Sequence, residues 1–288
     1  MGSCQIWQNC RMSKVTQAGP KNIVITGAAR GIGLATARAL AARGHRVAMS
    51  DLDGELADAE AEKLGDRASG HSLDVTDREA FRAHLEEVEQ QSGPIDVLIN
   101  NAGIASASPN VLEEDPALTD RTIEINLKGV MNGTIEAIRL MEPRRRGQVV
   151  NISSLAGLMG VAGLAAYSAA KFGVLGFTES VRIEFADSGL LFTCVMPGPV
   201  DTGMMDGTSV SPIVSMLKPE EMAAGIVAAV ESGKPRVALP RSSWLLTRLI
   251  SLLPPGVGIR LGRLTRVDRI YTNITPEARA SYEARIRG

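Results

Sequence analysis

The chain has 288 residues, of which 44% are hydrophobic and 22% charged, and its formal net charge is −1. This balance excludes a disordered or fibrous protein, and the lack of a positive excess argues against nucleic-acid binding. Three cysteines and three histidines without metal-ligand spacing predict no metal site, no disulfide framework and a reducing, cytoplasmic location. No apolar stretch reaches the roughly 20 residues that a membrane-spanning helix needs.

Short apolar segments alternate with segments of helical periodicity between residues 21 and 240. Strands are predicted at residues 22–26, 46–50, 71–75, 95–100, 148–152 and 191–195. Helices are predicted at residues 34–43, 56–64, 78–91, 118–141 and 167–187. Such alternation is typical of right-handed βαβ units. The predicted fold is therefore α/β: a single three-layer, Rossmann-like domain in which helices cover both faces of a doubly wound parallel sheet.

The two ends of the chain differ from this domain. Residues 1–20 lack the apolar core of a signal peptide and are predicted to be a flexible leader. Residues 241–288 are predicted to be a helical, basic C-terminal extension, with nine arginines, three acidic residues and an apolar segment at 244–253. Two interpretations of this extension remain. Its helices pack on the body with their arginines in solvent, or they make a peripheral contact with a membrane or an anionic, lipid-like substrate.

A glycine-rich segment, TGAARGIG at residues 26–33, lies between the first predicted strand and the first predicted helix. Its three glycines permit a tight turn and the close approach of a pyrophosphate, whose charge the helix N-terminus would favour. The alternative is a plain strand-to-helix turn, but the strand before it and the helix after it favour dinucleotide binding. The candidate cofactor contacts of this segment are Gly27, Arg30, Gly31, Ile32 and Gly33.

An acidic residue, Asp51, follows the second predicted strand, 24 residues after Gly27. A carboxylate at this place can accept hydrogen bonds from both ribose hydroxyls of NAD, and it repels the 2′-phosphate of NADP. Arg30 is a contrary feature, because its charge would attract that phosphate. Since repulsion at the ribose excludes NADP whereas Arg30 can simply contact solvent, the sequence predicts NAD rather than NADP.

Tyr167 and Lys171 are four residues apart and therefore lie on the same face of a predicted helix. The pKa of a free tyrosine is about 10, and the positive charges of Lys171 and of the nicotinamide ring of bound NAD⁺ are expected to lower it. A tyrosine of lowered pKa can take the proton of an alcohol as hydride leaves for NAD⁺, and in reverse it protonates the growing alkoxide. We therefore interpret Tyr167 and Lys171 as a catalytic pair that also contacts the cofactor.

Further motifs accompany this pair in a fixed order: Asn100-Asn101-Ala102-Gly103, Ser154, and the segment PGPVDT at residues 197–202. With the glycine-rich segment and Tyr167-Ser168-Ala169-Ala170-Lys171, they make residues 20–240 resemble the single-domain branch of the short-chain dehydrogenase/reductase family. The resemblance implies that Ser154 holds the substrate oxygen and that Asn126 maintains a water-linked proton path with the lysine. It also implies that the protein is a homodimer or homotetramer.

The same resemblance implies further contacts with the cofactor. Asp74 would lie near the adenine amine, with Val75 beside it, and Asn101 would lie beside the adenine ribose. Asn101 and its neighbour Asn100 are alternatively braces between the central strands. Val200 and Thr202 would contact the carboxamide of the nicotinamide.

The predicted activity is hydride transfer between NAD(H) and a secondary alcohol or ketone. In this family the segment after Pro197 and the C-terminus select the substrate, and Met204, Met205, Met216 and Leu217 indicate a broad hydrophobic pocket for a steroid- or lipid-like compound. The alternative is that these side chains fill the core or an oligomer contact. Two rival functions remain: an NAD(H)-binding sensor without turnover, and a lyase or epimerase that holds NAD tightly.

Overall fold

The computed structural model describes residues 19–209 and 216–287. All but the last two residues of the predicted leader at 1–20 lie outside this range. Seven strands form one parallel sheet in the order β3-β2-β1-β4-β5-β6-β7. Their bounds are β1 Asn22–Thr26, β2 Arg46–Asp51, β3 Ala68–Ser72, β4 Val97–Asn100, β5 Gly147–Ile152, β6 Leu190–Pro197 and β7 Arg236–Leu239.

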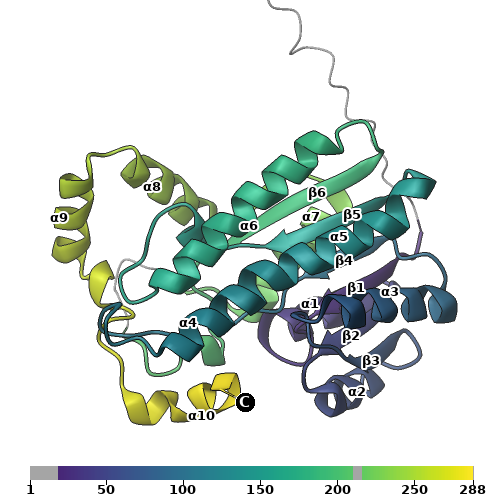
Figure 1. Cartoon of the computed structure of the whole chain (residues 1–288), viewed down its shortest axis with the longest axis horizontal. Helices are drawn as coiled ribbons and strands as arrows, with labels where there is room; N and C mark the ends of the chain where they lie inside the picture. Colours follow the sequence, from purple (N-terminus) through teal and green to yellow (C-terminus); the bar gives the residue numbers. More distant parts are fainter. Residues whose placement is uncertain (1–18, 210–215, 288) are drawn as a thin grey trace, which may run out of the picture.

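The helices connect these strands and continue beyond the last one (Figure 1). The helices between strands are α1 Gly31–Ala41, α2 Gly54–Glu62, α3 Arg78–Ser92, α4 Pro116–Ile123, α5 Val130–Met141, α6 Ala165–Glu184 and α7 Pro219–Ser232. The extension contains α8 Arg241–Ser251, α9 Pro255–Thr265 and α10 Pro276–Arg287. Short turns at Leu155–Gly157 (η3), Gly203–Met205 (η4) and Val267–Arg269 (η5) border the cavity described below.

Alternate side chains of the strands enter two separate hydrophobic cores, as the period of two in a β-strand requires. Ile23 and Ile25 of β1 pack with α1 and α7 on one face, where Leu40 and Ile226 are fully buried. Val24 packs on the other face, in a core to which α3, α5 and α6 contribute. Both faces of the sheet are thus covered, and the predicted doubly wound fold is confirmed.

Two predicted elements differ from those observed, and two observed elements, β7 and α7, were not predicted. The third strand is Ala68–Ser72 rather than 71–75, because this edge strand carries small and polar side chains and gives no apolar signal. The seventh strand has four residues and was not predicted. The helix predicted at 118–141 is interrupted by a π-helical segment, η1 Glu124–Gly129, and such insertions are frequent at functional sites.

The order of the strands positions the site. From β1 to β3 each new strand is added on one side of the sheet, and from β4 to β7 each is added on the other side. The order therefore reverses between β1 and β4, which are paired parallel neighbours. The loops that follow these two strands therefore diverge at the carboxyl edge of the sheet, and ligands of doubly wound folds bind in the crevice that results. The glycine-rich segment follows β1 and the Asn101 segment follows β4, so both lie at this reversal point.

Candidate active site

A cavity of about 1140 Å³ opens at the carboxyl edge of the sheet. Of the fifteen residues predicted for the site, thirteen line it, and only Gly33 and Asn126 do not. The thirteen are Gly27, Arg30, Gly31, Ile32, Asp51, Asp74, Val75, Asn101, Ser154, Tyr167, Lys171, Val200 and Thr202. Residues at the ends of six strands and on two helices, α1 and α6, are thus brought together, although they span 176 positions from Gly27 to Thr202.

The glycine-rich segment is shaped for the close approach of a ligand. Gly27 and Gly31 have φ angles of 64° and 54°, a left-handed conformation that favours glycine. A Cβ atom on Gly33 would lie 2.1 Å from the carbonyl oxygen of Gly27, so Gly33 is required for packing rather than for lining the cavity. Arg30, the N-cap of α1, makes no side-chain cap, which leaves the first amides of α1 free for an anion. The segment therefore fits the pyrophosphate of a dinucleotide.

The side chains of Asp51 and Arg30 both have polar partners within the protein at the edge of the cavity. The Asp51 carboxylate accepts hydrogen bonds from the backbone amides of Ala29 and Asp53, at 3.0 and 3.2 Å. The Arg30 guanidinium forms an ion pair of 2.7 Å with the Asp53 carboxylate. This hydrogen bond with Arg30 holds the pKa of Asp53 below its usual value. The positive charge of Arg30, which was the contrary feature of the sequence, therefore has an acidic partner within the protein.

Two other predicted cofactor contacts brace the backbone of the site. The Asn101 amide donates to the carbonyl oxygens of Thr26 and Gly27 at 2.9 and 3.0 Å, and thereby joins the end of β4 to the glycine-rich segment. Asn100, by contrast, lies in the core and donates to Asn151 of β5 at 2.8 Å. One oxygen of Asp74 accepts hydrogen bonds from the amide and hydroxyl of Thr76. Both asparagines thus connect neighbouring strands or loops, as the alternative given in the sequence analysis states.

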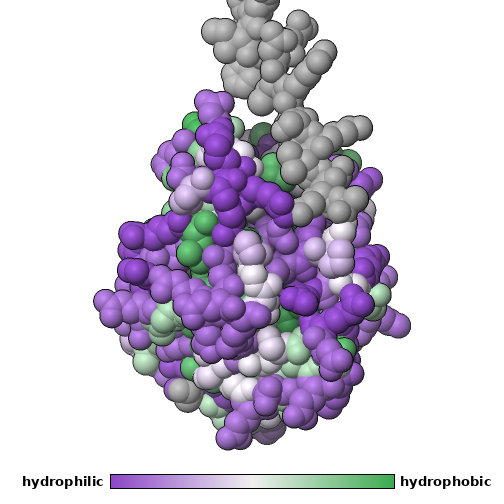
Figure 2. All heavy atoms as spheres, turned by 90° about the vertical axis from the view of Figure 1, so that its right-hand side faces the viewer, coloured by the Kyte–Doolittle hydropathy of each residue, from purple (hydrophilic) through white to green (hydrophobic). Residues whose placement is uncertain are grey.

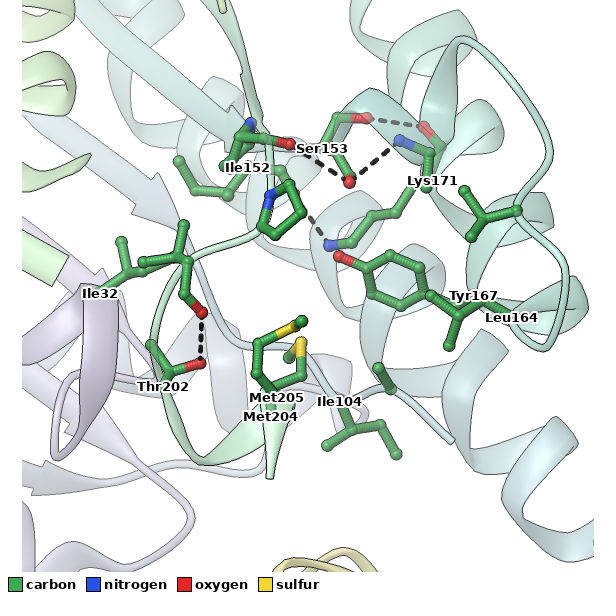
Figure 3. A pocket seen from close by; sticks show the side chains of 18 of the residues that line it. Ile32, Ile104, Ile152, Ser153, Leu164, Tyr167, Lys171, Thr202, Met204 and Met205 are labelled. Carbon is green, nitrogen blue, oxygen red and sulfur yellow. Dashed lines mark hydrogen bonds between the residues drawn. The ribbon is translucent and has the colours of Figure 1, made fainter. Parts of the chain in front are cut away.

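The polar end of the cavity contains Ser154, Tyr167 and Lys171. The two residues of α6 lie one turn apart, with the Lys171 Nζ atom 5.5 Å from the centroid of the Tyr167 ring. Figure 3 shows the tyrosine hydroxyl and the lysine amine at the same side of the cavity, facing Met204 and Met205. The Lys171 Nζ atom donates to the carbonyl oxygen of Ile152 at 2.9 Å, which holds the amine in place.

The structure distinguishes the two neighbouring serines. The Ser153 hydroxyl donates to the carbonyl oxygen of Lys171 at 2.8 Å and so ties the end of β5 to α6. The Ser154 hydroxyl accepts a hydrogen bond of 3.1 Å from the Ala156 amide, donates a long one of 3.4 Å to the carbonyl oxygen of Pro197, and forms a hydrogen bond with Tyr167. The long bond to Pro197 is the weakest of these, so the Ser154 proton can turn toward a ligand, whereas the Ser153 proton is held by Lys171.

Burial shifts both titratable groups toward their neutral forms. Because it removes Tyr167 from water, burial raises the pKa of its hydroxyl above the usual value, and the hydrogen bond with Ser154 offsets only part of this. Burial lowers the pKa of Lys171 to about 8. Burial is thus the larger effect on the tyrosine pKa in the chain by itself. The lowering expected from Lys171 together with bound NAD⁺ concerns the complex with the cofactor and stays a prediction.

Asn126 lies behind the wall of the cavity, in the π-helical segment. Its side chain accepts a hydrogen bond from the Ile104 amide at 2.8 Å and donates one to the Ile104 carbonyl oxygen at 2.6 Å. Its Oδ1 atom is also close to Gly103, where a Cβ atom would lie 2.7 Å away and only 3.6 Å from the Lys171 amine. Asn126 thus holds the loop after β4 next to the lysine, and its predicted proton path stays a prediction.

The residues predicted for the nicotinamide and substrate sides divide into two groups. Thr202 lines the cavity and lies against Gly31, while Val200 is also part of a hydrophobic core. Met204 and Met205 line the cavity as predicted. Leu217 instead packs on a hydrophobic core, and neither it nor Met216 lines the cavity. The alternative of core filling is therefore correct for Leu217.

The C-terminal extension supplies residues that the sequence analysis did not identify. All three tyrosines of the chain line the cavity, two of them, Tyr271 and Tyr282, from the extension. Arg279 of α10 is fully buried and binds three backbone carbonyl oxygens. The inner faces of α8 and α9 line the outer part of the cavity. A buried arginine in a basic helix gives no sequence signal, because its neighbours in sequence are exposed.

Comparison with known proteins agrees with this geometry. The family model for short chain dehydrogenases matches residues 21–211. The chain belongs to the short-chain dehydrogenase family. It is 40% identical over 215 residues to cis-4-hydroxycyclohexanecarboxylate dehydrogenase of Sinomonas cyclohexanicum. The aligned region covers 70% of this chain and 86% of that protein.

Two other members of the short-chain dehydrogenase family are similar to the same extent. The 3-oxoacyl-acyl-carrier-protein reductase FabG of Escherichia coli is 36% identical, over 74% of this chain and 83% of the relative. FabG of Thermotoga maritima is 38% identical, over 72% and 89% respectively. Short-chain dehydrogenases are oxidoreductases that bind a nicotinamide cofactor, act on small molecules and generally form homo-oligomers. The extension formed by α8, α9 and α10 lies beyond the matched residues.

Proposed function

We propose that the protein transfers a hydride between NAD(H) and a secondary alcohol or ketone on a hydrophobic body, such as a steroid- or lipid-like compound. The observation that carries this proposal is the position of Tyr167. Its hydroxyl lies with Lys171 and Ser154 at the polar end of a cavity whose remaining walls include methionines and leucines. A carbonyl or hydroxyl group is accommodated at the polar end, and an apolar body fits the rest.

The residues of the polar end divide the chemistry among them. A bound nicotinamide supplies or accepts the hydride. The Ser154 hydroxyl holds the substrate oxygen, and the Tyr167 hydroxyl donates its proton to that oxygen in reduction or takes the proton in oxidation. Lys171 orients and polarises the tyrosine from the same helix face.

NAD is the proposed cofactor, held by the residues that line the inner part of the cavity. The α1 amides and the glycines would bind the pyrophosphate, and the Asp51 carboxylate would accept the ribose hydroxyls. Asp74, Val75 and Asn101 would border the adenosine, and Val200 and Thr202 the carboxamide. The ion pair between Arg30 and Asp53 supports NAD over NADP, because an arginine with an acidic partner attracts a 2′-phosphate less strongly.

The relatives support the class of substrate. One is named for an alcohol on a cyclohexane ring, and the others are named for a ketone on an acyl chain. Each name describes an oxygen on a secondary carbon attached to an apolar body. The proposal extends this chemistry, and not those particular compounds, to the present chain.

A homodimer or homotetramer is the proposed assembly, with contacts along α4, α5 and α6. Two large apolar side chains support a contact at α6, since Phe172 is 45% and Ile183 78% exposed. Sedimentation equilibrium measures the mass of the assembly. A mass of one chain would contradict this part of the proposal.

The first experiment is a fluorescence titration of NADH and of NADPH into the purified protein. Tighter binding of NADH is expected in the wild type, and Asp51→Ala should reduce this preference about tenfold, which corresponds to about 1.4 kcal/mol. Asp187→Ala is the matched control, because Asp187 is exposed and does not line the cavity. Tighter binding of NADPH by the wild type would contradict the choice of NAD.

A turnover assay separates the proposed enzyme from its rivals. Hydrophobic secondary alcohols are offered with NAD⁺, and matching ketones with NADH, while absorbance of NADH is followed. Binding without turnover of any compound would favour a sensor. NAD that remains bound through purification and is released only on denaturation would favour a lyase or epimerase.

A further inference from the structure

The helices α8 and α9 carry an unusual concentration of exposed apolar side chains. Nine of the fifteen large hydrophobic side chains exposed among the described residues lie between residues 245 and 264. Neither helix contains a buried residue. Figure 1 shows both helices projecting from the layered body, and Figure 2 shows that the opposite end of the molecule is mostly hydrophilic. The exposed apolar surface is therefore concentrated at one end of the protein.

The cavity accounts for only part of this apolar surface. Leu246 and Ile250 of α8 line the cavity. Leu245, Leu249 and Leu252 do not line it, and their spacing of four and three residues places them in one stripe along another face of the helix. They are 54%, 55% and 82% exposed. This outward stripe has no function in the site already described.

The outward stripe is surrounded by positive charge. Residues 241–269 contain six arginines and one acidic residue, Asp268. All six arginines are exposed, and none forms an ion pair with another residue in the described part of the chain. Leucines bordered by free arginines are typical of helices that lie in the interface of an anionic membrane.

The length of the helices fits this arrangement. A helix of 11 residues is about 16 Å long, whereas a bilayer core is about 30 Å thick. Among the described residues, moreover, no helix is both long and apolar enough to cross a membrane. The two helices are therefore suited to lie along a membrane surface rather than to span it.

A second copy of the chain fits the same surface less well. A two-fold contact places identical patches against each other, so that the arginines of one copy would face those of the other. Like charges opposed in this way disfavour association. Anionic lipid headgroups, in contrast, supply the missing negative charges while the acyl chains receive the leucines.

We propose that the outward stripe and its flanking arginines bind an anionic membrane surface, with α8 and α9 lying along it. The inward faces of the same two helices line the cavity. If the proposed function is correct, an apolar alcohol or ketone dissolved in the membrane therefore enters the cavity beside the membrane-bound helices and reaches Tyr167 at its polar end.

Vesicle sedimentation with the full chain tests the proposal. We expect pelleting with vesicles that contain about 30% phosphatidylglycerol, and about tenfold weaker binding to pure phosphatidylcholine or at about 0.5 M salt. The variant Leu245→Ser/Leu249→Ser/Leu252→Ser should bind about tenfold more weakly or worse. Val111→Ser/Leu112→Ser is the matched control, because these side chains are 65% and 92% exposed outside the extension. It should bind as the wild type does.

A second variant separates charge from apolar contact. Arg260→Gln/Arg263→Gln should weaken binding to anionic vesicles about tenfold and leave the weak binding to neutral vesicles unchanged. NADH fluorescence in every variant verifies that the fold is retained. The assay contains no substrate, so its result does not depend on whether the proposed reaction occurs.

Two outcomes would overturn the proposal. One is equal pelleting of the wild type and the triple serine variant on anionic vesicles. The other is a triple serine variant whose assembly mass falls in analytical ultracentrifugation while its vesicle binding is unchanged, since the stripe would then be a contact between copies of the chain.

Discussion

Arg279 of α10 donates a hydrogen bond of 2.6 Å to the carbonyl oxygen of Ala105, which lies 174 residues earlier in the chain. The same guanidinium donates to the carbonyl oxygens of Met204 and Asp206 at 3.1 Å each. The hydroxyl of Tyr282, almost one turn along the helix, accepts a hydrogen bond of 2.8 Å from the Ala105 amide. The C-terminal helix thus joins two loops that border the cavity, one after β4 and one at η4.

Replacement of this arginine should affect substrate binding more than cofactor binding. Arg279→Met leaves three carbonyl oxygens without their donor, and we expect a loss of about 3 kcal/mol in the free energy of unfolding. The loops at Ala105 and Met204 lose their connection, so KM for an apolar alcohol should rise, whereas Kd for NADH should stay within about twofold. Urea denaturation, initial rates and NADH fluorescence measure the three quantities.

The control for this change is Arg287→Met on the same helix. Arg287 pairs with Asp115, and both side chains are partly exposed, so its loss should cost less than about 1 kcal/mol. Equal losses in the free energy of unfolding of the two variants would contradict the role of Arg279 in joining the two loops.

The three tyrosines of the cavity allow a direct test of the catalytic assignment. Tyr167→Phe removes the proposed proton donor and should reduce kcat by a factor of about 10² to 10⁴, with NADH affinity nearly unchanged. Tyr271→Phe removes a hydroxyl that donates to the Met205 sulfur at 3.4 Å, and it should change kcat by less than about threefold. The assignment is wrong if the second variant loses turnover and the first retains it.

The ion pair between Arg30 and Asp53 offers a test of cofactor choice that leaves Asp51 intact. Asp53→Asn removes the charge that neutralises Arg30, yet an asparagine still caps α2 through the Leu56 amide. The affinity for NADPH relative to NADH should therefore rise, by up to about tenfold. Competition between the two cofactors in a fluorescence assay measures the ratio. Asp66→Asn, an exposed acid at a distance from the cavity, is expected to leave it unchanged.

Lys171 makes the stability of the protein depend on pH. Its pKa is about 8 in the fold against 10.5 for a free lysine, so the unfolded chain binds more protons between these values and stability rises with pH across that interval. Below pH 8 the charged, buried lysine costs up to about 3 kcal/mol. Lys171→Met removes that cost but leaves the Ile152 carbonyl oxygen without its donor, at about 1 kcal/mol.

The lysine variant should therefore be more stable than the wild type at pH 7, by about 1–2 kcal/mol, while losing turnover. The advantage should disappear by about pH 10, because the wild-type lysine is then neutral in the fold. Thermal unfolding of both proteins from pH 7 to 10 measures the difference. A difference that does not change with pH would show that Lys171 is not the titrating group.

Elements with strong local patterns were predicted well from the sequence. The first two strands and the helix carrying Tyr167 have apolar residues at the expected period and clear ends, and the observed bounds differ by only a few residues. The third and seventh strands were misplaced or missed. Both lie at the edges of the sheet, where one side lacks a neighbouring strand and few apolar residues are required.

The sequence by itself determined the layered fold, the glycine-rich segment after β1 and the pairing of Tyr167 with Lys171, because all three depend on residues close in the chain. Only the tertiary structure decided that Arg30 pairs with Asp53, that Arg279 is buried against Ala105, and that α8 and α9 turn one face to the cavity. The burial that raises the pKa of Tyr167 also comes from the tertiary structure. These properties depend on burial and on contacts between distant segments, and neither is encoded in the spacing of neighbouring residues.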